Sequence, residues 1–182
     1  MKNSIGMVEF KNIAKGIEAT DGMLKASQID LLQALPVCPG KYLVIVGGEL
    51  SSVQSSVQYA VNRYEENVID SFVIGNISSQ VFPAVSGVVE IKNRNALGII
   101  ETFTAASAIE AADMAVKAAV IELIEVRIAR GMGGKCFVMM TGGVSDVTAA
   151  VEAGAKRAEE QGTLVNTSVI PNNHELQWEK QL

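Results

Sequence analysis

Apolar and polar residues follow two spacings along this chain, and the order of the spacings is the same in both halves. Short runs rich in Ile, Val, Leu and Phe predict β-strands, whereas longer stretches with apolar or small residues near helical spacing predict helices. Two of the strands, 41–47 and 135–141, are apolar on both faces, so we expect them to be buried. The predicted strands are 4–10, 29–35, 41–47, 68–75, 96–102, 121–129, 135–141 and 163–170, and the predicted helices are 13–27, 50–66, 105–119 and 144–161.

This shared order comes from an internal repeat. When the chain is shifted by 92 residues, residues 5–31 lie over 97–123, and eleven of the 27 positions are identical. Further on, GKYLVIVGG at 40–48 matches GKCFVMMTGG at 134–143 once one residue is inserted. A search for such repeats comes before the interpretation of any single motif, because a repeat defines the architecture.

Each copy has the predicted order β-α-β-β-α-β, which is an α+β sandwich of ferredoxin-like type. We expect one domain at 4–86 and a second at 96–182, joined by GVVEIKNRNA (87–96), which is polar and charged in its second half. Many unrelated activities use this layout, so the predicted fold indicates little about function.

Composition narrows the class of protein. The chain has 182 residues, of which 48% are hydrophobic, and a mean hydropathy of +0.25. No run of eighteen apolar residues occurs, which argues against a membrane span, and we expect much apolar surface to be buried against other subunits. The net charge of −5 without a basic stripe argues against nucleic-acid binding. Two cysteines make no disulfide framework, which favours the reducing cytoplasm.

One cysteine, Cys38, stands between Pro36 and Pro39 in the stretch LPVCPGK. A buried structural thiol is one interpretation, because most free cysteines are small buried hydrophobes. The two prolines oppose it, because they fix the backbone and remove donors, as suits a rigid loop. The second copy has RGMGG in this place, and a strand rather than a helix follows. The phosphate-loop interpretation therefore fails, and these glycines suit tight turns.

Other candidate residues favour structural roles. Cys136 lies within a predicted strand, where a packing role is the simplest interpretation. His174 is the one histidine, so neither a metal site nor a catalytic triad is indicated, and we expect a surface or capping role. Glu9 and Glu101 are matched by the repeat, and structural hydrogen bonding is expected of both. We therefore expect no enzymatic activity.

Several motifs resemble those of the bacterial microcompartment shell domain. They include DGMLKA (21–26) and DMAVKAA (113–119), each preceded by a strand with Gly-x-x-Glu, and SVIPNNHE (168–175). The Gly-rich loop before Gly-Lys and the Gly-Gly that ends the next strand are also similar. Two such domains in one chain resemble the tandem-domain class, whose trimers imitate single-domain hexamers. Within it, VCPGK and GMGGKC resemble the T subtype of propanediol-utilisation microcompartments.

This resemblance implies a place and a set of partners. It implies a homotrimer whose six domains form a flat pseudo-hexameric tile in a microcompartment shell, in contact with other shell proteins. Lys25 and Lys117, late in the first helix of each copy, are implied to lie at contacts between tiles. Two loops are implied to line a central pore, and their residues are Pro36, Val37, Cys38, Pro39, Gly40, Arg130, Gly131, Met132, Gly133 and Gly134.

The same resemblance implies a cofactor. In a trimer three Cys38 thiols converge on one axis, where three thiolates can hold a [4Fe–4S] cluster by three of its irons and leave the fourth to another ligand. Such a pore would transfer electrons across the shell, with a redox enzyme in the lumen as a further partner, or deliver the cluster. Three alternatives stay open: a thiol ring without a cluster, a metabolite pore narrowed by Cys38, and a small ligand-binding or enzymatic oligomer.

Overall fold

The computed structural model describes residues 3–128 and 131–180, which form two compact units. The main boundary along the chain lies between Ile77 and Ser78, and residues 131–133 are grouped with the first unit. Residues 78–86 belong to the second unit, although the sequence places them within the first predicted domain. The domain extents 4–86 and 96–182 otherwise stay a prediction.

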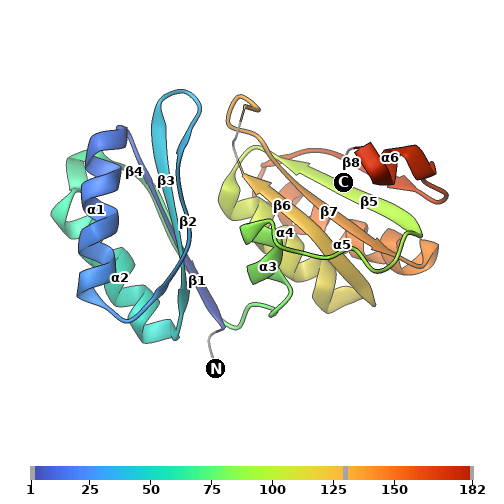
Figure 1. Cartoon of the computed structure of the whole chain (residues 1–182), viewed down its shortest axis with the longest axis horizontal. Coiled ribbons are helices and arrows are strands. Elements are labelled where there is room, and N and C mark those ends of the chain that lie inside the picture. Colours follow the sequence, from blue (N-terminus) through green and yellow to red (C-terminus); the bar gives the residue numbers. More distant parts are fainter. Residues whose placement is uncertain (1–2, 129–130, 181–182) are drawn as a thin grey trace. The chain divides into compact units, whose positions relative to one another are not determined.

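The first unit is a four-stranded antiparallel sheet covered by two helices on one face (Figure 1). Its strands lie in the order β2-β3-β1-β4. A core of apolar side chains, including Val8, Phe10, Val44 and Met23, fills the space between this sheet and the helices. The elements are β1 (Ser4–Phe10), α1 (Ile13–Ala26), β2 (Asp30–Val37), β3 (Lys41–Gly48), α2 (Leu50–Arg63), the 3-10 turn η1 (Glu65–Asn67) and β4 (Val68–Ile74).

The second unit repeats this arrangement with the strand order β6-β7-β5-β8 (Figure 1). Helices α4 and α5 cover one face of its sheet. Two short helices, α3 and α6, were not predicted from the sequence, because six residues are too few to show a helical period. The elements are α3 (Val81–Ser86), β5 (Ala96–Thr102), α4 (Ala105–Ala118), β6 (Ile121–Ile128), β7 (Cys136–Gly142), α5 (Val144–Glu160), β8 (Leu164–Ile170) and α6 (Glu175–Lys180). The predicted β-α-β-β-α-β order is confirmed in both units.

Close approach of a helix to the sheet explains one of the repeated glycines. A Cβ placed on Gly6 would lie 2.7 Å from Val53 Cγ1 and 2.7 Å from Val57 Cγ2. A Cβ placed on Gly98 would lie 2.7 Å from Val147 Cγ1. These distances are shorter than van der Waals contact, so each first strand needs glycine where the second long helix of its unit crosses it.

Candidate functional site

The first predicted pore loop is the tip of the β2–β3 hairpin. The Val37 carbonyl accepts a hydrogen bond of 3.0 Å from the Gly40 amide, which closes a turn over these four residues. The Cys38–Pro39 peptide bond is cis, as in type VI turns. Gly40 has a φ of 86°, a left-handed conformation that favours glycine. Pro36 and Val37 belong to β2, so the loop is shorter than the predicted range 36–40.

Within this turn Val37 is buried, Cys38 is half-buried, and Pro39 and Gly40 are exposed. The Cys38 thiol is therefore held at a hairpin tip that solvent reaches, and it is not a core side chain of its own chain. Val37 pairs with Lys41 across the strands, and Pro36 pairs with Tyr42. The ladder thus runs up to the residue that precedes the cysteine, which fixes the base of the turn.

The second predicted pore loop has the same place between β6 and β7 but different residues. Arg130 lies outside the described residues. Gly131, Gly133 and Gly134 have φ angles of 72°, 63° and 93°, so left-handed backbone explains all three glycines. Met132, two residues before the shared Gly-Lys pair, stands where the first copy has Cys38.

Each loop is followed by a lysine that pairs with a glutamate on the neighbouring strand. Lys41 Nζ lies 3.2 Å from Glu9 Oε1, and Lys135 pairs in the same way with Glu101. Glu9 and Glu101 therefore take part in ion pairs at the bases of the two hairpins. This is the structural hydrogen bonding that the sequence predicts for them.

Lys25 and Lys117 differ more than the repeat suggests. Each pairs with the aspartate four residues earlier, at 2.6 Å for Asp21 and 2.5 Å for Asp113. The Lys25 and Asp21 side chains are 74% and 65% exposed, whereas those of Lys117 and Asp113 are 43% and 8% exposed. Asp113 Oδ1 also accepts a hydrogen bond of 2.8 Å from the Ser78 amide, so the second pair is held in place.

The remaining candidates have structural surroundings. Cys136 is fully buried in β7, as the packing interpretation predicts. His174 Nδ1 accepts a hydrogen bond of 3.2 Å from the Leu176 amide near the start of α6, which fits the predicted capping role. Within the described residues, no group of three or more His, Cys, Asp or Glu side chains could hold a metal ion. None of the described helices is long and apolar enough to cross a membrane.

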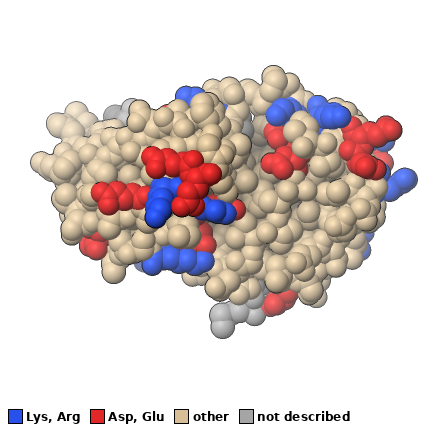
Figure 2. All heavy atoms as spheres, turned by 180° about the vertical axis from the view of Figure 1, so that it is seen from behind, with Lys and Arg blue, Asp and Glu red and all other residues tan. Residues whose placement is uncertain are grey.

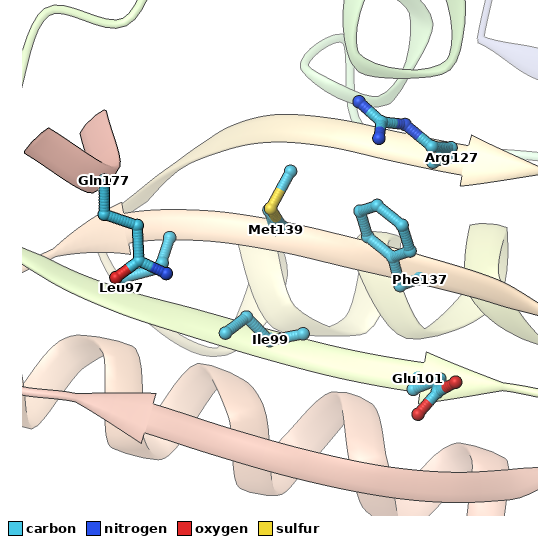
Figure 3. A pocket seen from close by; sticks show the side chains of 7 residues that line it. All are labelled: Leu97, Ile99, Glu101, Arg127, Phe137, Met139 and Gln177. Atoms are coloured by element: carbon cyan, nitrogen blue, oxygen red, sulfur yellow. The ribbon is translucent and has the colours of Figure 1, made fainter. Parts of the chain in front are cut away.

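A groove on the second sheet was missed by the sequence analysis. It lies on the sheet face that α6 partly covers and has a volume of about 500 Å³ (Figure 3). Figure 3 shows Ile99, Met139 and Phe137 along its floor. The guanidinium carbon of Arg127 lies 5.1 Å from the Phe137 ring centre. The lining residues are Leu97, Ile99, Glu101, Arg127, Phe137, Met139 and Gln177.

The apolar residues on both faces of 135–141, the strand that contains β7, are a sequence signal near this groove. They predict burial, but they cannot show that one face stays open in the single chain. The charged side chains elsewhere are mixed: on the face shown in Figure 2, Lys and Arg lie beside Asp and Glu, between wide areas without charge. Contacts on such a surface depend on shape and apolar area more than on a strong field.

Known proteins match both copies. The family model for the BMC domain matches residues 4–77 and 96–173. The bacterial microcompartment shell protein PduT of Citrobacter freundii is 43% identical over 178 residues, covering 98% of this chain and 97% of PduT. The bacterial microcompartment shell protein EutM of Salmonella typhimurium is 44% identical over 79 residues, covering 43% of this chain and 80% of EutM.

A solved structure also agrees along nearly the whole chain. It is a microcompartments protein from Desulfitobacterium hafniense DCB, with a TM-score of 0.96 and 47% sequence identity, covering 98% of this chain and 99% of that one. The match to a shell protein along nearly its full length, together with two family matches in tandem, confirms the resemblance found in the sequence. The chain therefore belongs to the BMC-domain family of bacterial microcompartment shell proteins, and it carries two BMC domains in tandem.

Proposed function

We propose that the chain forms a homotrimeric shell tile whose three Cys38 thiols meet at the central pore and hold one [4Fe–4S] cluster. The observation that carries this proposal is the position of Cys38. Its thiol lies at a solvent-accessible hairpin tip, within a chain whose described residues contain no group of three or more His, Cys, Asp or Glu side chains that could hold a metal ion. Further ligands must then come from other copies of the chain.

The tile itself is supported by the tandem domains. A single-domain relative, EutM, matches about one copy, and the family resemblance implies six domains around a pore. Two domains per chain give that number with three chains. The role of the protein is then structural rather than catalytic, and other shell proteins are its neighbours. Lys25 and Lys117 are proposed contacts between tiles, and Lys25 is the more exposed of the two.

The residues around Cys38 fit a cluster held by thiolates. The hairpin ladder ends one residue before Cys38, and Pro39 follows it, so the backbone that carries the sulfur is restricted on both sides. Three thiolates bind three irons, and the fourth iron is left to a ligand from outside the three Cys38 residues. When bound, such a cluster supplies one-electron transfer. A pore at the centre of a shell tile would then connect a redox enzyme in the lumen with a carrier outside.

The second candidate function is a metabolite pore without a cluster. The observation in its favour is the second loop, where Gly131, Gly133 and Gly134 carry no side chains that could bind a metal. In that case Cys38 only narrows the opening. The two functions differ in one measurable property, which is the iron content of the trimer.

The test is iron and acid-labile sulfide analysis of anaerobically reconstituted protein, with light scattering to establish the number of chains. We expect three chains with about four irons, and we expect Cys38→Ser to leave the trimer intact without iron. Cys136→Ser is the matched control, because it removes the buried thiol and should keep the iron. A wild-type trimer without iron would contradict the proposed cluster. In that case, sheets of the protein seen by electron microscopy would still support the proposed shell tile.

A further inference from the structure

Within the second unit, the segment that follows the last strand of copy 1 packs on the first helix and edge strand of copy 2. The Ser78 amide donates to Asp113 Oδ1 on α4. The Gln80 side chain accepts a hydrogen bond of 3.1 Å from the Leu123 amide and donates one of 3.3 Å to the Ile121 carbonyl. Gln80 thereby satisfies two backbone groups along β6, which is an edge strand.

The same surface exists in the first unit, but it is open. Three identical pairs of residues from the repeat show the difference. Leu123 is 2% exposed, whereas its counterpart Leu31 is 43% exposed. Ile109 is 0% exposed, whereas its counterpart Ile17 is 54% exposed. The Asp113 side chain is 8% exposed, whereas that of its counterpart Asp21 is 65% exposed.

Leu31, Ile17 and Asp21 therefore form a surface that we call the α1–β2 surface. Two more large apolar side chains of α1, Ile13 at 38% and Leu24 at 40% exposure, extend it. Exposed apolar side chains that gather on one helix and an adjoining edge strand mark an interaction site rather than scattered surface residues.

The chain also contains a second segment of the type that covers this surface. Strands β4 and β8 both end in isoleucine, at Ile74 and Ile170, and an asparagine follows two residues later in each case. By this alignment, His174 corresponds to Ser78 and Leu176 corresponds to Gln80.

Helix α6 is anchored on its own sheet through Trp178, which is 4% exposed and packs with Leu97 and Met139. Its Leu176 is nevertheless 59% exposed. Residues 172–180 thus carry an exposed apolar side chain at the position that Gln80 takes in the segment that packs on copy 2.

We propose that residues 172–180 of one chain dock on the α1–β2 surface of a second copy, with Leu176 against Leu31 and His174 beside Asp21. This inference rests on the proposed homotrimer and names its contact. The contact is heterologous, since one chain contributes the segment and the next contributes the surface, and three such contacts close a ring. His174 Nδ1 accepts the Leu176 amide, so Nε2 is the ring atom that is left to donate to the Asp21 carboxylate.

Cysteine cross-linking of the full chain tests the contact directly. In a Cys38→Ser background, we expect Asp21→Cys combined with His174→Cys to give covalent dimers and trimers on oxidation, seen on a non-reducing gel. Each single cysteine variant is the control and should give neither. The pair Leu31→Cys and Leu176→Cys repeats the test at a second position.

Two outcomes separate this inference from the proposal on which it rests. If light scattering shows a trimer but neither cysteine pair links chains, the docking contact is wrong and the homotrimer stands. If the wild-type protein is not a trimer, the proposed tile itself is wrong. We also expect Leu31→Asp to raise the trimer dissociation constant at least tenfold, whereas Ile69→Asp, at a similarly exposed apolar position on β4, should leave it unchanged.

Discussion

The two copies of the repeat share one fold, but their residues differ in two ways: some differences are compensated by a neighbouring residue and others are not. In the compensated positions, a change in one residue is matched by a change in the residue it touches. Gly16 lies against Tyr42 in copy 1, where a Cβ on Gly16 would come 2.5 Å from the ring, and the matching pair in copy 2 is Ala108 and Cys136. The larger residue at the helix position thus occurs with the smaller residue on the strand, which avoids the clash that Ala beside Tyr would make.

Cys38 and Met132 differ without any such compensation. They stand at the tips of equivalent hairpins, and neither tip is part of the packed core between sheet and helices. Core packing does not explain why the two tips carry different residues. We therefore expect this difference to reflect a functional difference between the copies. By this comparison Cys136 has a packing role in the core, whereas Cys38 is the candidate for a functional role.

The largest expected effect comes from moving the thiol between the two tips. If the hairpins are equivalent around the pore, Cys38→Met combined with Met132→Cys places three thiols on the same axis. We expect iron to be absent from Cys38→Met and to return in the double variant. The measurement is iron per trimer after anaerobic reconstitution. Iron that stays absent in a trimeric double variant would show that the first hairpin is needed for its shape as well as its sulfur.

Next in size is the effect of the glycines that both copies share. Gly6→Ala and Gly98→Ala each place a methyl group about 2.7 Å from valine methyl groups. We expect each to lower the free energy of unfolding by about 1–3 kcal/mol, the usual cost of overpacking. Thermal unfolding at a fixed protein concentration measures it, with Gly48→Ala as the control, because a Cβ placed there would lie no closer than 3.6 Å to its nearest neighbour, Val53 Cγ2. Equal stability of the wild type and either core variant would contradict the close approach.

A smaller effect is expected from the compensated pair. Gly16→Ala alone should be destabilising by about 1–2 kcal/mol, because the new methyl group meets the Tyr42 ring. Combined with Tyr42→Cys, which makes the pair that copy 2 has, the same Gly16→Ala change should cost nothing or become stabilising. The double-mutant cycle measures this coupling. Additive effects would mean that the two changes in the repeat are independent.

The smallest effect concerns Glu18, whose counterpart Glu110 binds Arg157 at 2.7 Å instead. The hydrogen bond from Lys15 lowers the pKa of Glu18 below its ordinary 4.5. Desolvation opposes this shift, and a hydrogen bond from the Tyr64 hydroxyl lowers the pKa further. Because the pKa of Glu18 is lower in the folded state, the ionised Glu18 stabilises the fold above about pH 4.5. This stabilisation is lost as the pH falls through the folded-state pKa of Glu18.

An NMR titration of Glu18 tests this order of causes. Lys15→Met should raise the pKa of Glu18 more than Tyr64→Phe does, because the Lys15 bond is the larger cause. The change in stability should be small in both variants, since the Lys15 and Glu18 side chains are 48% and 52% exposed. A larger shift in Tyr64→Phe would reverse the assignment.

Much of the fold could be predicted from the sequence because local spacing carries it. The two β-α-β-β-α-β units follow from apolar periods and from identical residues such as Gly6 and Gly98. The short helices α3 and α6 could not be predicted, because contacts with β6 or with the second sheet hold them rather than their own periodicity. The hydrogen bond from Ser78 to Asp113 was also invisible, because it joins segments that no local pattern connects.

The candidate site was predictable only in part for a related reason. The prolines identified the Cys38 hairpin as a rigid tip, and the structure places the thiol where solvent reaches it. The partners of that thiol are proposed to lie in other chains, and a single chain does not contain their positions. The repeat is the sequence feature that indicates such partners, because two domains per chain give six domains with three chains.

The most direct test of the account is native mass spectrometry of the anaerobically reconstituted protein, because it measures chains and bound cluster in one particle. We predict a particle of three chains carrying the mass of one [4Fe–4S] cluster, and a Cys38→Ser particle of three chains carrying none. A cluster bound to a particle with a different number of chains, or one retained by the Cys38→Ser trimer, would contradict the account.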